Sequence, residues 1–578
     1  MKQTVEQRRA YMAGLLLLTT ALACSGRSTN GENAGGSAGT SNFAGAGGSG
    51  AGNAGGASGG STTSSGGSND NPLGGSAGSV ASGGSTIGGA GEGNDAGGEA
   101  SGGSAGEGPA DAVRFLLLEP PAPPSTPEGL MPDDERNLST SYCCASADAS
   151  VIVGSSTYVF PRFSDKPSGE LTRAFIWREK TGLKDLGSIS DPHQGFVASI
   201  TPAYLTADGS RVLGSYLLGE AGPGGSEPVW STHLGGFFVW SEAQGYTRIG
   251  PPNVADSGYI TGYSADAKTV LGQVQSGSDA WADFLWTEAD GFSWLKDLVG
   301  WPGEGRAISL SRDGSSILGI AGESGFRWRK AGFQWLGTVG IWPVCRPEVM
   351  SADGAVIAGV CQNGSQPPIT FRWTEAAGMA AIDVNSPVQI LPAAITDQGD
   401  VLVGSEVRAG GPLQHGLLQG FAFWQSGGNM QQTVSGADVE STYLLASHGL
   451  TPDGSAAIGA RLSNIRRSGD FQWTKTGGMR DLPPLNATDQ VYALGQSKDG
   501  RIVAGSSGPN AVLWDAAGAR DIAADLRSAS VDQKGWALSL ARGVISARSL
   551  ITHGSASKSV PNSTTPEERV WIAWLHAR

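Results

Sequence analysis

Histidine and cysteine, the residues that most often bind transition metals, are scarce in this chain. It has only six His and five Cys among 578 residues. None of them forms a CxxC pair or lies at another spacing typical of a metal ligand set. No nucleophile elbow, phosphate-binding loop or dinucleotide-binding motif stands between a strand and a helix. The sequence therefore predicts neither a cofactor nor a metal site, and it favours a binding protein over an enzyme.

Positive charge is also in short supply. The net charge is −14 at pH 7, and the folded part of the chain contains no block of Lys and Arg. Nucleic acids and anionic membrane surfaces both attract clustered basic side chains. The charge pattern therefore argues against either of them as a partner.

The first 23 residues form a signal peptide. Lys2, Arg8 and Arg9 make a positive start, and the apolar run 11–22 is too short to span a bilayer. The segment resembles a bacterial lipoprotein signal, which implies lipidation of Cys24 and a membrane anchor. Because Ser25 gives no reason for retention in an inner membrane, we expect display on the outer membrane or cell surface. Ala21 stands where such signals have Leu, so ordinary cleavage at the same bond, releasing a soluble secreted protein, is the alternative.

A low-complexity segment follows the signal. Residues 24–111 comprise Cys24 and a stretch of Gly, Ser, Ala, Asn and Thr without an aromatic cluster. Such a stretch buries too little apolar surface to offset the entropy lost on ordering, so we expect a disordered linker. Its root-mean-square reach would be about 50 Å. The folded domain is expected at 112–578.

A two-part phrase occurs nine times between residues 146 and 574. The first part is Ser/Thr-x-Asp-Gly followed by an apolar-x-Gly ending, as in TADGSRVLG (206–214), SADGAVIAG (351–359) and SKDGRIVAG (497–505). The second part is a short apolar run that ends in aromatic-x-Trp. Its Trp residues are Trp177, Trp240, Trp286, Trp328, Trp373, Trp424, Trp473, Trp514 and Trp574.

Each copy predicts four antiparallel strands. In residues 307–338 alternating apolar residues reach the turn Asp313-Gly314, and three further short runs follow. Four strands in about 45 residues is typical of a propeller blade. The sequence therefore predicts an all-β propeller of nine blades, or eight if the degenerate last copy merges with the N-terminal region. A β-sandwich or a solenoid is the alternative.

The repeated residues all have structural interpretations. Gly after Asp supplies the positive φ of a hairpin turn, and the Asp residues are expected to form turns rather than to bind ligands. We expect the Gly that ends strand two to let neighbouring blades approach closely. The Trp is expected to fill the space between adjacent sheets.

The two ends of the domain are expected to meet. The last copy has no fourth strand, and the apolar run 113–118 has no place in any copy. A propeller loses its exposed edges when a strand from one terminus completes the blade of the other. We therefore predict that 113–118 pairs with 570–575. A free N-terminal extension packed on the surface is the alternative.

The spacing of two cysteines predicts a disulfide. Cys345 and Cys361 are equidistant from Asp353, so they face each other in a hairpin centred there. The oxidising environment outside the cell permits this disulfide. The adjacent Cys143 and Cys144 either bridge each other or stay reduced, and the sequence does not choose between the two.

Insertions between strands two and three mark a candidate binding surface. Copies one, two, six and nine carry them, at 155–172, 216–235, 405–420 and 555–569. Copies nine, one and two would be neighbours in a closed ring, and binding residues commonly lie on such loops. The aromatic and imidazole side chains there that could contact a ligand are Tyr158, Phe160, Trp230 and His233. Packing of the loops themselves is the alternative role.

Acidic residues leave a second function open. A glycosidase needs two carboxylates, which different blades could supply without a local motif. The acids in the connections between copies are Asp191, Asp256, Glu304 and Glu348. Solvated loop acids are the alternative interpretation.

The repeats resemble those of one known family. RAFIW (173–177), GLKDLG (182–187) and the following apolar-Thr/Ser-x-Asp-Gly run resemble the HAF-repeat family of predicted extracellular proteins, over nearly all of 140–578. The resemblance implies export and a repeat-built β fold, but no activity and no site residues. We therefore predict a monomeric, membrane-anchored binding or scaffolding propeller with a carbohydrate or protein ligand. A secreted carbohydrate-active hydrolase or lyase is the alternative.

Overall fold

The computed structural model describes residues 113–121, 138–160, 169–189, 196–221, 228–250, 257–275, 281–364, 366–383, 386, 388–408, 421–428, 430–433, 441–444, 449–463, 466–544, 550–559 and 566–576. All of them belong to one compact unit of the chain. The predicted signal peptide, Cys24 and the linker lie outside the described residues. None of the described helices is long and apolar enough to cross a membrane.

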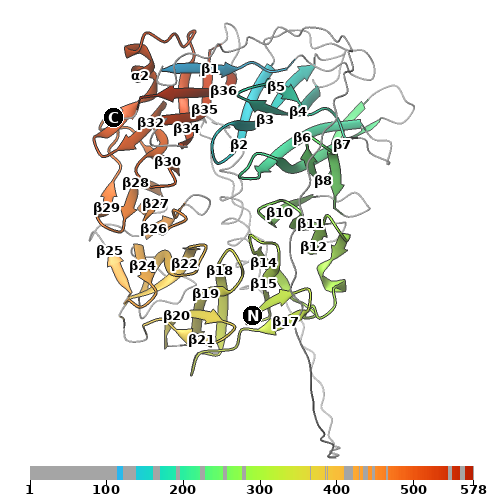
Figure 1. Ribbon diagram of the computed structural model, residues 1–578, viewed down its shortest axis with the longest axis vertical. Coiled ribbons are helices and arrows are strands. Elements are labelled where there is room, and N and C mark those ends of the chain that lie inside the picture. The colour runs from blue at the N-terminus through green and yellow to red at the C-terminus, as the bar shows by residue number, and fades with distance from the viewer. Residues whose placement is uncertain are drawn as a thin grey trace, which may run out of the picture. The chain divides into compact units, whose positions relative to one another are not determined.

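Strands make up almost all the regular structure of the described residues, which confirms the predicted all-β class. The 36 strands of the described residues form five four-stranded sheets and two eight-stranded ones (Figure 1). In each eight-stranded sheet a single parallel pair, Thr172–Ser199 or Ser324–Cys345, joins two sets of four antiparallel strands, and each set of four is called a unit here. Unit 1 contains β2 (Leu138–Ala145), β3 (Val151–Phe160), β4 (Gly169–Arg178) and β5 (Gly182–Asp185). Unit 2 contains β6 (Phe196–Leu205), β7 (Arg211–Ala221), β8 (Pro228–Ser241) and β9 (Gly245–Ile249). Unit 3 contains β10 (Ser257–Tyr263), β11 (Thr269–Gln275), β12 (Trp281–Thr287) and β13 (Gly291–Trp294).

The middle units have the same plan. Unit 4 contains β14 (Arg306–Leu310), β15 (Ser316–Ala321), β16 (Ser324–Arg329) and β17 (Gly332–Trp335). Unit 5 contains β18 (Val344–Met350), β19 (Val356–Asn363), β20 (Gln366–Thr374) and β21 (Gly378–Ala381). Unit 6 contains β22 (Val388–Ile395), β23 (Val401–Arg408), β24 (Phe421–Gln425) and β25 (Gln431–Thr433).

The last units add the two short helices of the described residues. Unit 7 contains β26 (Ser441–Leu444), β27 (Ala456–Ser463), β28 (Arg466–Thr474) and β29 (Gly478–Asp481). Unit 8 contains β30 (Val491–Gln496), β31 (Val503–Ser507), β32 (Asn510–Asp515) and β33 (Gly518–Asp521). Unit 9 contains β34 (Ala537–Val544), β35 (Leu550–Lys558), β36 (Glu567–Leu575) and β1 (Arg114–Leu118). The helices are η2 (Leu295–Asp297) after unit 3 and α2 (Ile522–Ser528) after unit 8, the latter capped by the Asp521 carboxylate.

The Ser/Thr-x-Asp-Gly turn is held by its own side chains. In unit 1 the Ser146 hydroxyl donates to Asp148 Oδ1 at 2.7 Å, and the same carboxylate oxygen accepts from the Ser150 amide at 3.0 Å. The Ser146 oxygen accepts from the Val151 amide at 3.0 Å. The hydrogen bond from Ser146 is the largest of the effects that lower the pKa of Asp148. The Asp residues therefore form turns, as predicted.

The glycine of this turn has a second role that the sequence did not reveal. Gly399 has φ +70, and a Cβ atom placed on it would lie 2.5 Å from Val356 of the preceding unit. Nearby, the Ala352 amide donates to the Asp397 carbonyl at 3.2 Å across the same boundary. The absence of a side chain at the turn therefore lets neighbouring units approach each other.

The glycine that ends strand two acts within its own unit, so its predicted role between blades is wrong. A Cβ atom on Gly359 would lie 2.1 Å from the Arg346 carbonyl oxygen and 2.7 Å from the Phe371 ring, both in unit 5. The cause is a β-bulge between Pro347 and Val349, which pushes the inner strand toward this glycine. The same irregularity recurs in the innermost strand of units 1 to 6, 8 and 9.

The repeated Trp fills the space between consecutive sheets, as predicted. Trp473 of unit 7 is 1% exposed and packs against Val401 and Val403 of unit 6. In unit 9 the expected Trp574 is replaced in this role by Trp571, which is fully buried against unit 8. Trp571 lies opposite Gly554 in the β35–β36 ladder. In most other units a Phe lies opposite the equivalent glycine, so Trp571 takes the place of that Phe.

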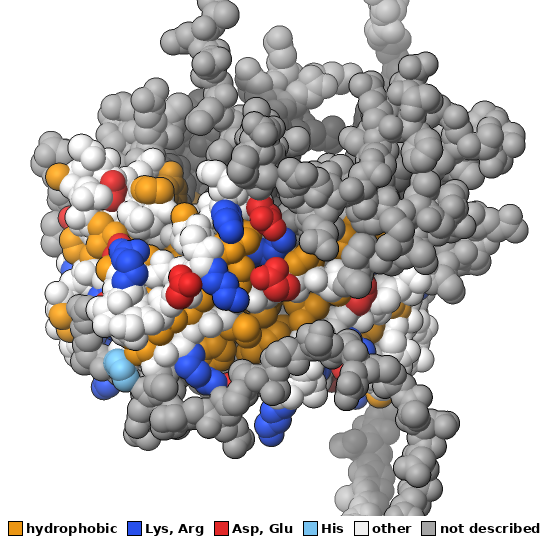
Figure 2. Space-filling model, turned by 90° about the horizontal axis from the view of Figure 1, so that it is seen from above, with side chains coloured by type: hydrophobic (Ala, Val, Ile, Leu, Met, Phe, Trp, Pro, Cys, Tyr) orange, Lys and Arg blue, Asp and Glu red, His pale blue; other side chains and the backbone are white. Residues whose placement is uncertain are grey.

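The predicted pairing of the two ends is confirmed. β1 runs antiparallel to β36 from the Arg114–Trp574 pair to the Leu118–Val570 pair (Figure 1). Leu118 belongs to the core shared with unit 1, while Phe115 and Leu117 pack against the core shared with unit 8. The molecule is seen from the β1 side in Figure 2, where basic and acidic side chains lie beside a band of hydrophobic ones. Arg114 of β1 pairs with Glu179 of unit 1 at 3.1 Å.

Two disulfides join cysteines in the described residues. Cys345 and Cys361 are directly opposed in the β18–β19 ladder, and their S–S distance is 2.04 Å. Both are buried in the core between units 4 and 5. Cys143 and Cys144 also bridge each other, at the bulge of β2.

Much of the insertions of units 1 and 2 is strand rather than loop, which corrects the sequence interpretation. β3 and β4 pair without interruption from Val151–Arg178 to Phe160–Gly169. β7 and β8 continue to the Ala221–Pro228 pair.

Deleting residues 113–118 from the full chain should lower the melting temperature sharply. β36 would lose β1, its ladder partner on one side, and the core would lose the side chain of Leu118, which is 3% exposed. Burial of one leucine contributes about 1.5–3 kcal/mol, so we expect a loss of more than about 5 kcal/mol from the whole strand. Thermal melts followed by circular dichroism measure it. Deletion of residues 60–65 in the linker is the control, and equal melting temperatures for the two deletions would contradict a structural role of β1.

Candidate functional site

The first predicted ligand contact, Tyr158, is a packing residue in the structure. Its ring is fully buried beside Leu171, and its hydroxyl donates to the Pro121 carbonyl at 3.0 Å. Burial raises the pKa of the phenol well above its ordinary value. The side chain faces the end of β1 because it lies on the face of β3 that covers unit 9. The expectation that Tyr158 contacts a ligand therefore does not fit its position.

The other three predicted contacts are placed only by their backbone. Phe160 ends β3, and Trp230 and His233 lie in β8. His233 is paired with Leu218 in the β7–β8 ladder. The side chains of all three lie outside the described residues.

Exposed large apolar side chains gather elsewhere in the described residues. They are Trp281 (43% exposed), Val299 (86%), Phe333 (37%), Trp335 (47%) and Ile341 (62%). All five belong to units 3 and 4 or to the connections that follow these units. Large exposed apolar side chains that cluster are typical of binding surfaces.

Four of these side chains share the boundary between units 3 and 4. Trp281 lies on the same face of β12 as Leu285, which packs in the core between these units. Phe333 and Trp335 reach that boundary from the other side, since both pack edge-on against Phe326 of the same core. We call the surface formed by Tyr259, Trp281, Val299, Phe333 and Trp335 the aromatic seam.

The connection from unit 3 to unit 4 presents Val299 to solvent. The Trp328 indole donates to the Val299 carbonyl at 3.2 Å, and the Trp301 indole donates to the Gly305 carbonyl at 3.1 Å. Trp301 is itself buried edge-on against Phe326, with ring centroids 5.1 Å apart. The two hydrogen bonds hold this connection against the core.

A polar network supports the aromatic seam from below. The Tyr259 ring lies 5.3 Å from the Trp281 ring, and the Tyr259 hydroxyl donates to Gln273 Oε1. Gln273 Nε2 donates to Asp283 Oδ1 at 2.5 Å, and Asp283 Oδ2 accepts from the Ala307 amide of unit 4 at 2.8 Å. Burial raises the pKa of Asp283, and these hydrogen bonds oppose the rise. Because both carboxylate oxygens are engaged, Asp283 positions Gln273 and Tyr259 and is poorly placed to transfer a proton to a ligand.

Sequence reasoning missed the link that Asp283 makes between units. The same link recurs where Asp470 accepts from the Ala493 amide at 2.5 Å and where Thr370 Oγ1 accepts from the Ile390 amide at 2.8 Å. In each case the polar residue directly precedes Phe-x-Trp. The sequences DFLW and DFQW contain this signal. A polar residue at the start of a buried run was not, however, recognised as a contact to the next sheet.

The predicted acids are not brought together as a catalytic pair by any described contact. Asp191 and Asp256 lie outside the described residues, and Glu304 is exposed in the connection before β14. Glu348 is the bulged residue of β18 and reaches solvent, yet crowding by protein atoms around the inner strand raises its pKa to about 7. Within the described ranges, no group of three His, Cys, Asp or Glu side chains could hold a metal ion.

Replacing Glu348 with Gln should change how stability depends on pH. The folded chain binds the Glu348 proton more tightly than the unfolded chain, so its contribution to stability is lost as pH rises from about 4.5 to about 7. Glutamine does not ionise, so the variant should gain stability relative to the parent between pH 5 and pH 8. Chemical denaturation across this range measures the difference, and a difference that does not vary with pH would contradict the raised pKa.

Comparisons with known proteins reach only distant structures. No protein-family model matches the sequence, and no curated protein does. The chain is similar to a prolyl endopeptidase with 15% identity and a TM-score of 0.35, over 66% of this chain and 55% of that one. It is similar to an oligogalacturonate lyase in complex with manganese (14%, TM-score 0.32, 66% and 98%) and to Porphyromonas gingivalis dipeptidyl peptidase 4 (8%, TM-score 0.38, 64% and 56%). At these TM-scores the likenesses carry no conclusion about what this chain binds or does.

Proposed function

We propose that this chain is a monomeric binding protein displayed on the bacterial surface, in which the nine units are blades of a closed propeller. Contacts between successive cores support closure, since one core joins Ile152 and Phe175 of unit 1 to Val570 and Ile572 of unit 9. The repeated phrase supports membership of the HAF-repeat family. The pairing of β1 with β36 in unit 9, separate from the pairing of β2 with β3 in unit 1, supports nine blades over the alternative of eight.

The ligand that fits the aromatic seam best is a carbohydrate. Trp281 and Trp335 offer flat apolar faces that stack against the C–H face of a sugar ring. The exposed Arg306 at the start of β14 lies close enough to Tyr259 of the aromatic seam for its charge to act on the phenol. A mixture of aromatic faces and a few polar groups is typical of small-molecule and sugar sites. The single observation that carries the proposal is that exposed aromatic side chains of two adjacent units face the same boundary.

Binding to a glycan array should depend on the two exposed indoles. We expect Trp281→Ala and Trp335→Ala each to weaken retention of the preferred glycan at least about tenfold, or about 1.4 kcal/mol, because each substitution removes a flat apolar face that the sugar ring would cover. Ile341→Ala is the matched control, since it removes an exposed apolar side chain outside the aromatic seam. Unchanged glycan retention in both Trp variants would contradict the proposed site.

Catalysis is the second candidate, favoured by one observation. A carboxyl with a pKa of about 7 is suited to hold or release a proton at neutral pH, and Glu348 has that value. A hydrolysis screen on the glycans retained by the array separates the two functions. Released sugars that disappear in Glu348→Gln would establish a carbohydrate-active hydrolase or lyase and overturn a purely binding role.

Anchoring through Cys24 completes the proposal. A lipid on this residue and a linker through residue 111 would hold the propeller clear of the surface. The full-length product should partition into detergent, and Cys24→Ala should release it or block its processing. Mass spectrometry of the mature N-terminus decides the matter, because an unmodified Cys24 after export would favour the soluble secreted form.

A further inference from the structure

Charged pairs join neighbouring units at a fixed place in the repeat. The residue two positions after the repeated Trp pairs with a charge of the preceding unit at five boundaries. These pairs are Glu179–Arg114 (3.1 Å), Glu242–Lys184 (2.5 Å), Glu288–Arg211 (2.8 Å), Lys330–Asp290 (3.0 Å) and Glu375–Arg327 (2.8 Å). The remaining four boundaries lack such a pair among the described residues, and the position there holds Ser426 (between units 5 and 6), Lys475, Ala516 and His576.

The boundary between units 4 and 5 shows what the complete arrangement looks like. Arg327 lies between Phe326 and Trp328, is 3% exposed and stacks over Trp373 at 4.6 Å. Its guanidinium donates to Gln334 Oε1 at 3.0 Å and to Glu375 Oε2 at 2.8 Å. A third hydrogen bond reaches the Gly354 carbonyl at 3.3 Å. The buried cation is therefore fully paired.

Arg372 occupies the equivalent place in unit 5 without those partners. The residue paired with it in the ladder is Ala380, where Arg327 is paired with Gln334. Ser426 replaces the acid of the next unit. The Arg372 Nε atom is buried and has no hydrogen-bond partner, and no acid among the described residues forms an ion pair with this side chain. An unpaired buried donor of this kind costs free energy unless a ligand or water satisfies it.

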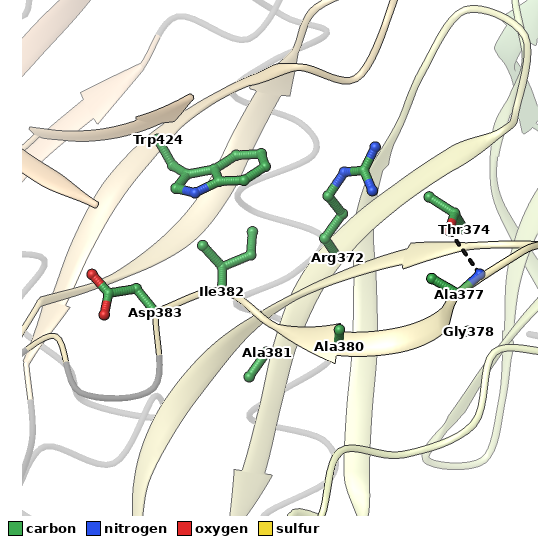
Figure 3. A pocket seen from close by; sticks show the side chains of 9 residues that line it. All are labelled: Arg372, Thr374, Ala377, Gly378, Ala380, Ala381, Ile382, Asp383 and Trp424. Atoms are coloured by element: carbon green, nitrogen blue, oxygen red, sulfur yellow. Dashed lines mark hydrogen bonds between the residues drawn. The ribbon is translucent and has the colours of Figure 1, made fainter. Parts of the chain in front are cut away.

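A pocket of about 210 Å³ lies beside Arg372 and includes Ala380 in its lining (Figure 3). Its lining residues are Arg372, Thr374, Ala377, Gly378, Ala380, Ala381, Ile382, Asp383 and Trp424. Figure 3 shows Arg372 and Trp424 on one side, with Ile382 and the alanines below them. The Asp383 carboxylate lies beyond Ile382, away from Arg372, and accepts from the Met430 amide at 3.4 Å.

We propose that this pocket binds a small organic acid, whose carboxylate pairs with the Arg372 guanidinium as the Glu375 carboxylate pairs with Arg327 at the preceding boundary. A carboxylate matches the fork of donors on Arg372 and forms charge-assisted hydrogen bonds with it. The body of the ligand is apolar, because Trp424, Ile382 and Ala380 cover it. The negative charge of Asp383 keeps the carboxylate at the Arg372 end. The pocket is separate from the aromatic seam, so the inference does not depend on the proposed function.

Isothermal titration calorimetry on the full chain tests the proposal with benzoate as the probe. Benzoate should bind the parent protein, and benzyl alcohol, its neutral analogue, should bind at least about tenfold more weakly because it makes no charged hydrogen bond. Arg372→Gln should lower the benzoate affinity by a similar factor. The double substitution Ala380→Gln and Ser426→Glu restores the arrangement of the preceding boundary and should abolish binding by filling the pocket.

Arg327→Gln is the matched control, because it removes the equivalent arginine, which is paired with Glu375 and does not line this pocket, and it should leave benzoate affinity unchanged. Circular dichroism establishes that each variant is folded. If the double substitution does not fold, Arg372→Gln and the neutral analogue still decide the question. The proposal is overturned if benzoate does not bind the parent at millimolar concentration, if Arg372→Gln binds it equally well, or if inorganic phosphate binds as tightly as benzoate, which would indicate an anion site without an apolar component.

Discussion

Every sheet in this protein is apolar on both faces, so each must be covered by a neighbour on each side. Ile152 and Val153 are adjacent on β3 and both fully buried, one in the core shared with unit 9 and the other in the core shared with unit 2. A four-stranded sheet cannot bury two apolar faces by itself, and an open row of sheets would leave two faces in water. The first and last units therefore have to meet, and β1 supplies the strand that unit 9 lacks.

The same requirement explains most of the repeated residues. The turn glycine brings two units close, the Trp fills the gap between them, and the residue before Phe-x-Trp ties one sheet to the backbone of the next. These roles belong to the fold, so they carry no information about a ligand. Information about binding lies instead in the places where one copy departs from the others. The exposed indoles of Trp281 and Trp335 are one departure, and the loss of an acid and an amide around Arg372 is another.

Predictions from the sequence pattern were correct where the interactions involved are between residues close in the sequence. Alternation and Asp-Gly turns predicted the hairpins, and equal distances from Asp353 placed Cys345 opposite Cys361 in the ladder. It failed where a side chain's surroundings depend on a distant segment. Tyr158 was assigned to a loop, but it is buried against Pro121, which is 37 residues away in the sequence. Gly359 was assigned to contacts between blades, but a one-residue bulge in β18 directs it toward its own sheet.

The sequence by itself determined the repeat, the strand order within each unit, the turn chemistry and the segment that completes the last sheet. These features follow from residue spacing and from the need to cover apolar strands, which act over a few residues or recur in every copy. Only the tertiary structure decided which residues of two neighbouring units meet. The aromatic seam combines residues of β10, β12 and β17 with the connection after unit 3, and the Arg372 pocket combines residues of unit 5 with Trp424 of unit 6. Neither combination leaves a local motif, since each site is formed by side chains that face each other across a boundary between sheets.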